Sequence, residues 1–170
     1  MRIFALAVLA AACGGSSNTV GSQGNCTASL SGAVTASGVT CTAVAGTDTN
    51  GSGTGAIGIT FVSTGGPSAT VAVKTTGTPT TKTYANTDSD ANGACQVTQS
   101  NNQFWVAAAG TPTSNQGTYS VSITGLGNEV TNPDGGPGNV FLSVHGTANC
   151  TMPAIAGTGA TGTVTLTATF

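Results

Sequence analysis

Charged side chains are scarce in this sequence, and their scarcity argues against several classes of protein. Of 170 residues, three are Lys or Arg and five are Asp or Glu, so charged residues make up 5% of the chain. Binding to nucleic acid depends on clustered Lys and Arg that neutralise phosphates. Three basic residues spread along the chain form no such patch, so we predict no nucleic-acid partner.

The side chains that carry out most enzymatic chemistry are equally rare. His145 is the only histidine, so the sequence offers neither a histidine pair for zinc nor a second imidazole base. No Gly-x-Ser-x-Gly sequence marks a nucleophile elbow. We therefore predict that the protein is not an enzyme. His145 occupies an outward position of a predicted strand, where we favour a surface histidine over a ligand contact.

No stretch repeats apolar residues every three or four positions, as an amphipathic helix would. Instead, apolar residues alternate with Thr, Ser and Ala, which predicts strands with one buried and one solvated face. Gly-rich turns separate these strands. The pattern predicts an all-β fold, a single antiparallel β-sandwich of about nine short strands over 26–170. Over 140–150 it places Val140, Leu142 and Val144 inside and Phe141 outside.

A hydrophobic run long enough to span a bilayer is also missing, because a transmembrane helix needs about 20 apolar residues. The apolar run from Ile3 to Ala12 follows the basic Arg2 and ends in small residues, which is the layout of a secretory signal peptide. Cleavage before Cys13 is predicted to remove residues 1–12 on export, to a compartment where disulfides form.

The residues before Cys13 also resemble the lipobox of bacterial lipoproteins, in which a lipidated cysteine becomes the N-terminus. The chain has five cysteines, and lipid on Cys13 leaves an even number for disulfides. The alternative is an ordinary signal peptide that leaves Cys13 unmodified. The resemblance implies acyl chains such as palmitate, and Gly14 in place of Asp implies the outer membrane, on its periplasmic or cell-surface face. Residues 14–25 are predicted to be a flexible Gly/Ser tether.

The resemblance extends to most of the chain. The Ala-Ala-Cys-Gly-Gly of residues 11–15, the opening strand hairpin and the Thr-rich ending of 145–170 resemble small lipoproteins of myxobacterial type. This resemblance implies the fold and the location but no activity.

The other four cysteines fall on apolar faces of predicted strands, so we expect two disulfides across the core. A turn at 35–38 would place Gly32 opposite Cys41 and leave Cys26 about 20 Å away, at about 3.3 Å per residue. A disulfide needs Cα atoms within about 7 Å. We therefore predict that Cys26 does not pair with Cys41, and we favour Cys41–Cys95 with Cys26–Cys150.

One loop carries oxygen ligands in a pattern that calcium uses. Asp88, Asp90 and Asn92 alternate before Gly93, as in the first half of a calcium-binding loop. The bidentate glutamate that closes such a loop is missing, and Gln99 stands in its place. We favour a polar hairpin loop, with a calcium site as the alternative, and we predict no other cofactor.

Two further features bear on ligands. Trp105 is the only tryptophan, and its ring either stacks on a sugar or fills the core. The Thr row over 163–169 is by default a solvated sheet face, with binding of a glycan or of ice as the alternative. We predict a lipid-anchored, non-enzymatic envelope protein with a structural or protein-interaction role, whose partner is an envelope protein or glycan. The alternative is a carbohydrate-binding or adhesion module, with or without calcium.

Overall fold

The computed structural model describes residues 26–47, 54–63, 66–108, 117–132 and 138–170. Every regular element in these residues is a strand, and all the strand pairs are antiparallel, which confirms the predicted all-β class. The strands are β1 (Thr27–Gly32), β2 (Ala36–Thr47), β3 (Gly55–Val62), β4 (Ser68–Thr75), β5 (Thr83–Ala85), β6 (Ala91–Thr98), β7 (Phe104–Ala108), β8 (Thr118–Leu126), β9 (Glu129–Thr131), β10 (Asn139–Phe141), β11 (Val144–Pro153) and β12 (Thr163–Thr169).

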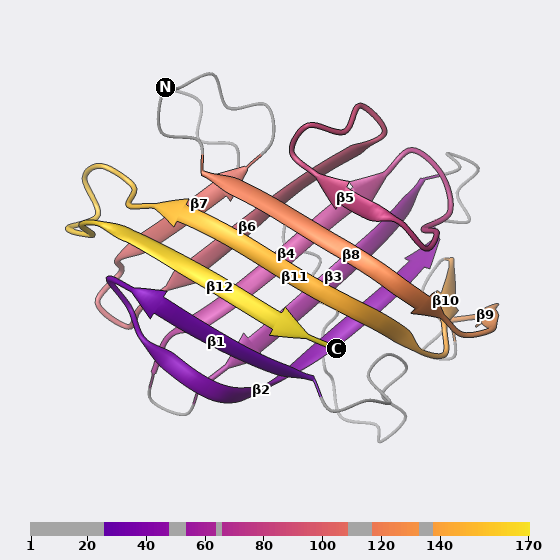
Figure 1. Ribbon diagram of the computed structural model, residues 1–170, viewed down its shortest axis with the longest axis horizontal. Coiled ribbons are helices and arrows are strands. Elements are labelled where there is room, and N and C mark those ends of the chain that lie inside the picture. Colours follow the sequence, from indigo (N-terminus) through magenta and orange to yellow (C-terminus); the bar gives the residue numbers. More distant parts are fainter. Residues whose placement is uncertain (1–25, 48–53, 64–65, 109–116, 133–137) are drawn as a thin grey trace.

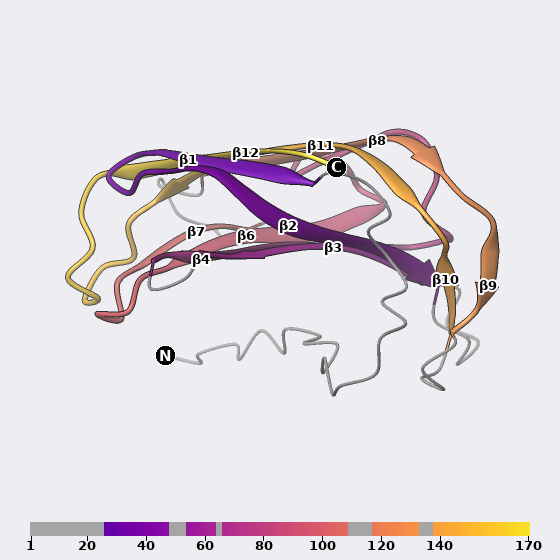
Figure 2. The same ribbon diagram turned by 90° about the horizontal axis from the view of Figure 1, so that it is seen from below.

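Ten of these strands form one continuous sheet in the order β5-β8-β11-β12-β1-β2-β3-β4-β6-β7. Figure 1 and Figure 2 show that the sheet curls like a half-barrel, so that the layer with β8, β11, β12 and β1 faces the layer with β3, β4, β6 and β7. Strand β2 belongs to both layers, because it pairs first with β1 and then with β3. The β9–β10 hairpin pairs with the end of β2.

The predicted number of about nine strands was too low, because twelve are present in the described residues. Strands β5 and β9 have three residues each, which is too short to show an alternating pattern. Strand β10 was merged with β11 in the prediction, although the chain breaks between them.

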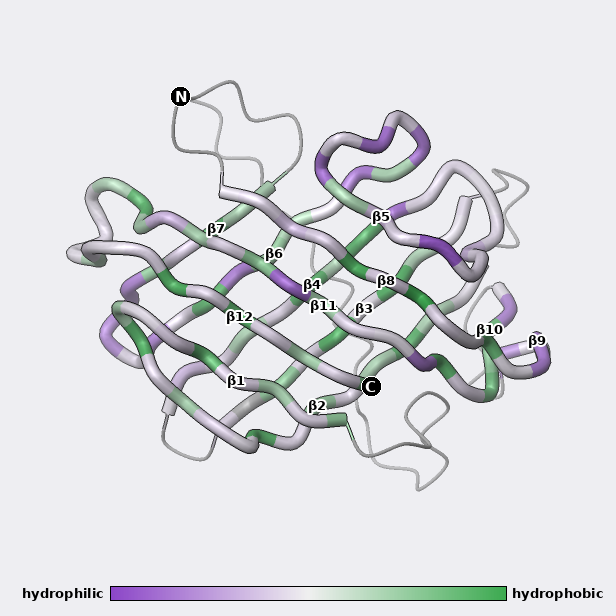
Figure 3. The backbone as a smooth tube through the Cα atoms, viewed as in Figure 1, coloured by the Kyte–Doolittle hydropathy of each residue, from purple (hydrophilic) through white to green (hydrophobic). Residues whose placement is uncertain are grey.

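The core lies between the two layers and is filled by the inward residues of the strands. In β11 and β12 the alternation has the predicted phase, since Cys150, Met152, Val164 and Leu166 are at most 1% exposed. Figure 3 shows this alternation as hydrophobic and paler segments along the strands. Complete burial of one such aliphatic side chain contributes about 1.5–3 kcal/mol. The largest fully buried side chains include Tyr84, Tyr119, Phe61, Ile57, Ile59 and Met152.

The predicted phase was wrong at the start of this run. Phe141 is 7% exposed and lies in the core, whereas Leu142 is 45% exposed. The chain leaves the strand conformation at Leu142 and Ser143, where Leu142 N–H donates to Asn128 O at 3.0 Å. This break changes which face the following residues present, so one uninterrupted alternation over 140–150 does not exist.

The first disulfide joins Cys26 to Cys41, which contradicts the predicted pairing. The hairpin turn occupies 31–35, earlier than predicted, since Leu30 pairs with Ala36 and Thr27 with Thr40. Cys41 N–H therefore donates to Cys26 O at 3.1 Å, and the two Cα atoms are 4.9 Å apart.

The second disulfide joins Cys95 of β6 to Cys150 of β11, with Cα atoms 6.3 Å apart. The two disulfides together contradict the favoured pairings Cys41–Cys95 and Cys26–Cys150, although all four cysteines are buried and bonded as expected. Because β6 and β11 belong to opposite layers, this bond crosses the core and links the two halves of the sheet.

Candidate functional site

Trp105 fills the core and does not line a groove. Its side chain is 2% exposed, and Nε1–H donates to Thr161 O at 3.1 Å. The backbone of β7 also reaches the segment after β11, because Trp105 forms a bridge with Ala154 and Ile155 N–H donates to Phe104 O at 2.9 Å. The indole thus closes one end of the curled sheet, and its face is not available for stacking on a sugar.

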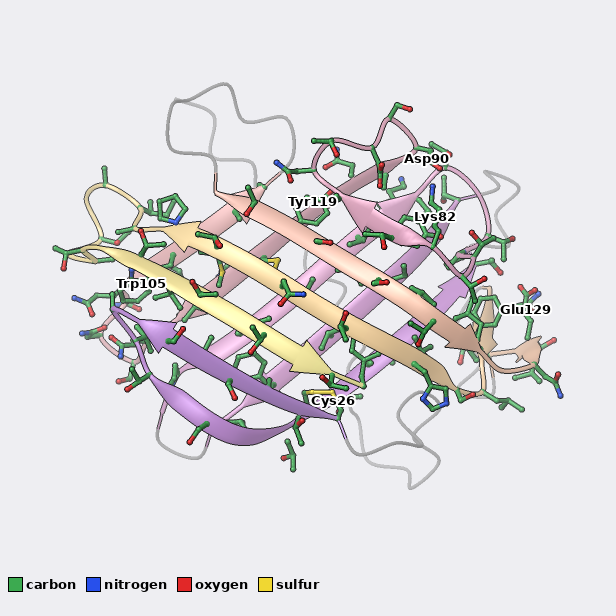
Figure 4. The ribbon with its side chains drawn as sticks, in the orientation of Figure 1. Cys26, Lys82, Asp90, Trp105, Tyr119 and Glu129 are labelled. Carbon is green, nitrogen blue, oxygen red and sulfur yellow. A yellow bond between two sulfur atoms is a disulfide. The ribbon has the colours of Figure 1, made fainter. Side chains whose placement is uncertain are left out.

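The loop around β5 holds the candidate calcium ligands. Asp88 Oδ2 accepts the Ala85 N–H at 2.8 Å and closes a turn, in which Asp88 N–H donates back to Ala85 O at 3.0 Å. The Asp90 carboxylate forms an ion pair with Lys82. Figure 4 shows Lys82 and Asp90 next to each other beside β5. Each carboxylate therefore already has a partner within the protein.

The hydrogen bond between Lys82 and Asp90 shifts the protonation of both groups. It raises the pKa of Lys82 and lowers the pKa of Asp90, because each charge stabilises the other. The Lys82 ammonium also lies 4.8 Å from the centre of the Tyr84 ring, within the range of a cation–π contact. Since both charges are partly exposed, solvent and salt weaken the pair.

Tyr84 fastens this loop to the core. Its ring is 1% exposed, and its hydroxyl accepts the Thr80 N–H at 2.7 Å and lies 3.2 Å from Thr80 O, to which it donates. The loop and strand ends border a shallow polar hollow of about 350 Å³, lined by residues that include Lys74, Asp88, Asp90 and Asn92.

The hollow brings Asp88, Asp90 and Asn92, the three predicted calcium ligands, together with the positively charged Lys74. Asn92 lies in β6 and pairs in register with Lys74. Within the described ranges, no group of three or more His, Cys, Asp or Glu side chains is arranged to hold a metal. Calcium binding at Asp88, Asp90 and Asn92 stays a prediction, and any ion there would compete with the Lys82 pair.

His145 is exposed on β11, in the outward position that the sequence predicted. It lies opposite Gly125 of β8, where the register shifts between His145 and Gly146. A Cβ atom at Gly125 would lie 3.5 Å from His145 Cδ2, which is an ordinary van der Waals distance. The position is distant in sequence from the β5 loop and from Trp105, and the structure does not combine these candidates into one site.

Tyr119 is a buried polar residue that the sequence did not indicate. Its side chain is 1% exposed, and no described residue bonds its hydroxyl with normal geometry. Burial raises the pKa of Tyr119. The ring packs on Gly93, where a Cβ atom would lie 2.9 Å from Tyr119 Cζ. The sequence predicted Gly93 as the end of a loop, whereas the structure places it inside β6, where a glycine often marks a close approach.

Cys13 and the tether that follows it, within residues 1–25, lie outside the described residues. In the ranges that the structure does describe, no helix is long and apolar enough to cross a membrane.

The outward faces of β8, β11, β12 and β1 form one surface, which we call the hydroxyl face. Its strands lie side by side in one nearly flat layer in Figure 2, and Figure 4 shows short side chains with oxygen tips along them. The register aligns these residues in three rows across the strands. The rows are Ser122–Thr147–Thr169–Thr27, Ser120–Asn149–Thr167–Ser29 and Thr118–Thr151–Thr165–Ser31.

Comparison with known proteins gives no relative: no family model, no curated protein and no solved structure matches this chain.

Proposed function

We propose that the protein is a lipid-anchored, non-enzymatic domain of the bacterial cell envelope, with a structural or protein-interaction role. The observation that carries this proposal is the pairing of the cysteines. Two disulfides use Cys26, Cys41, Cys95 and Cys150, which leaves Cys13 as the odd one of five. A cysteine that follows a signal-like segment and has no disulfide partner in its own domain is suited to carry lipid.

The disulfides also support export, because such bonds form and persist in oxidising compartments. The curled sheet, with a covalent bond across its layers, would serve as a stable sandwich-like scaffold on a flexible tether of residues 14–25. The outer membrane is the proposed location, and the resemblance of residues 10–14 to a lipobox supports it.

The carbohydrate-binding alternative loses its aromatic platform, because Trp105 is 2% exposed and Tyr84 and Tyr119 are each 1% exposed. Sugar sites commonly use one aromatic face together with polar groups. The polar hollow beside Asp88 is shallow and contains Lys74. We therefore place the structural or interaction role first.

The anchor is tested by labelling with radioactive palmitate in a bacterial host that processes lipoproteins. We expect label and membrane association in the wild-type chain, and neither in Cys13→Ser. Disulfide-dependent migration of Cys13→Ser on a gel serves as the control, because the folded domain should be unaffected. Equal labelling of the two chains would refute the anchor.

A further inference from the structure

The hydroxyl face is ordered in two directions. Neighbouring strands in a sheet lie about 4.7–4.9 Å apart, and outward residues along one strand lie about 6.6–6.8 Å apart. Every position of its three rows is Ser or Thr except Asn149. Thr83 of β5 extends the first row, since its Oγ1–H donates to Ser122 Oγ at 3.2 Å. Thr is restricted at χ1, so these hydroxyls are partly preorganised.

The three rows of the hydroxyl face contain no charged residue and no aromatic ring, and His145 lies beyond the first row on the same face of β11. None of its twelve aligned positions is Asp, Glu, Lys or Arg. Lys82, the neighbour of Thr83, contacts Asp90 and the Tyr84 ring. The three rows therefore offer a partner hydroxyl groups and one amide, without charge pairing or aromatic stacking.

Thr is common on strands, so the outer face of the other layer is the natural comparison. There the aligned row is Val44–Gly58–Ala72–Ala94–Ala108, which carries no hydroxyl at all. The row on one side of it begins with Thr42, Thr60 and Thr70 and continues with Gln96, and the row on the other side contains Lys74. The other layer thus has one run of three aligned threonines, whereas the hydroxyl face has three full rows of Ser and Thr with a single Asn.

Single exposed hydroxyls bind weakly, because each hydrogen bond to a ligand replaces one to water and contributes only about 0.5–1.5 kcal/mol. A rigid array becomes effective when its ligand repeats with the same spacing, since the loss of translational and rotational freedom is then incurred once for many contacts. This condition selects a ligand that is itself ordered in two dimensions.

The oxygen atoms of ice repeat at distances close to the spacings of these rows. Two O–H···O bonds of about 2.75 Å that meet at the tetrahedral angle place next-nearest oxygens about 4.5 Å apart, and the same lattice repeats about every 7.3 Å along its hexagonal axis. The spacings of a regular sheet agree with both to within about a tenth. Both layers share these spacings, so it is the three full rows of hydroxyl groups that distinguish the hydroxyl face. We infer that the hydroxyl face binds the surface of an ice crystal.

The test uses the full chain with Cys13→Ser, so that the protein is soluble, and measures the growth of ice grains in a frozen sucrose solution. We expect this chain to slow grain growth and to partition into a slowly grown ice hemisphere. Adding Thr167→Lys, in the centre of the hydroxyl face, should abolish both effects, because a long charged side chain holds the array away from the crystal. Thr147→Lys on a neighbouring strand should do the same.

Thr60→Lys is the matched control, since Thr60 is an exposed residue on the outward face of β3 in the other layer. It should retain the full effect, and thermal unfolding should show that all three variants are folded. The inference is overturned if the parent chain does not slow ice growth, or if Thr60→Lys is as damaging as Thr167→Lys. It is also overturned if Thr167→Lys removes binding to crystalline cellulose or chitin but leaves ice growth unchanged, a result that would assign the face to a glycan.

Discussion

The two disulfides should differ in the stability that they contribute, because they close loops of different length. Cys26 and Cys41 are 15 residues apart, whereas Cys95 and Cys150 are 55 residues apart. In the chain-entropy description, the cross-link restricts the unfolded chain, and the effect grows with the logarithm of loop length. The expected contributions to the free energy of unfolding are about 3.0 kcal/mol for the shorter loop and about 4.2 kcal/mol for the longer one.

Substitution alone would confuse the loss of a cross-link with the loss of buried sulfur. We therefore propose two double variants, Cys26→Ala/Cys41→Ala and Cys95→Ala/Cys150→Ala, each measured with and without a reducing agent. Reduction then breaks one remaining disulfide without changing any side chain volume. The first variant reports on Cys95–Cys150 and the second on Cys26–Cys41.

Urea unfolding followed by circular dichroism gives the free energy in each state. Reduction should cost the first variant about 1.2 kcal/mol more than the second. The corresponding falls in Tm are roughly 12 °C and 9 °C, at about 3 °C per kcal/mol for a domain of this size. Equal losses, or a larger loss on breaking Cys26–Cys41, would refute the argument from loop length.

Two further predictions concern the packing of Tyr119. Gly93→Ala should destabilise the fold by about 1–3 kcal/mol in urea unfolding, because the new Cβ would lie 2.9 Å from both Tyr119 Cζ and Ala72 O. Gly77→Ala is the control, since a Cβ atom at Gly77 would have no neighbour within 4 Å. A similar loss of stability in both variants would contradict the prediction. Tyr119→Phe should leave stability near neutral pH unchanged or raise it by up to about 1 kcal/mol, since it removes a buried hydroxyl without a good bond. Because burial raises the pKa of Tyr119, the folded state holds the phenolic proton more tightly, so wild-type stability should fall above about pH 10, where the unfolded chain ionises. Tyr119→Phe should show a shallower fall, and parallel pH profiles would rule out this role.

The class of the fold and the inward faces of most strands could be predicted from the sequence. Alternation with period two is a local property, and it placed Val164 and Leu166 inside because a strand presents successive residues to opposite faces. It also identified four cysteines as buried and bonded. The short strands β5 and β9 were missed because three residues are too few to show a period.

The pairing of the strands and their register could not be predicted from the sequence. Moving the partner of Cys41 from Gly32 to Cys26 shifts it by six residues, an even number that leaves Cys41 and its neighbours on the same face. The alternation is therefore equally consistent with both registers, and the position of the turn selected the disulfides. The gathering of Ser and Thr from β1, β8, β11 and β12 into aligned rows has the same origin, because it depends on pairings between segments far apart in the chain.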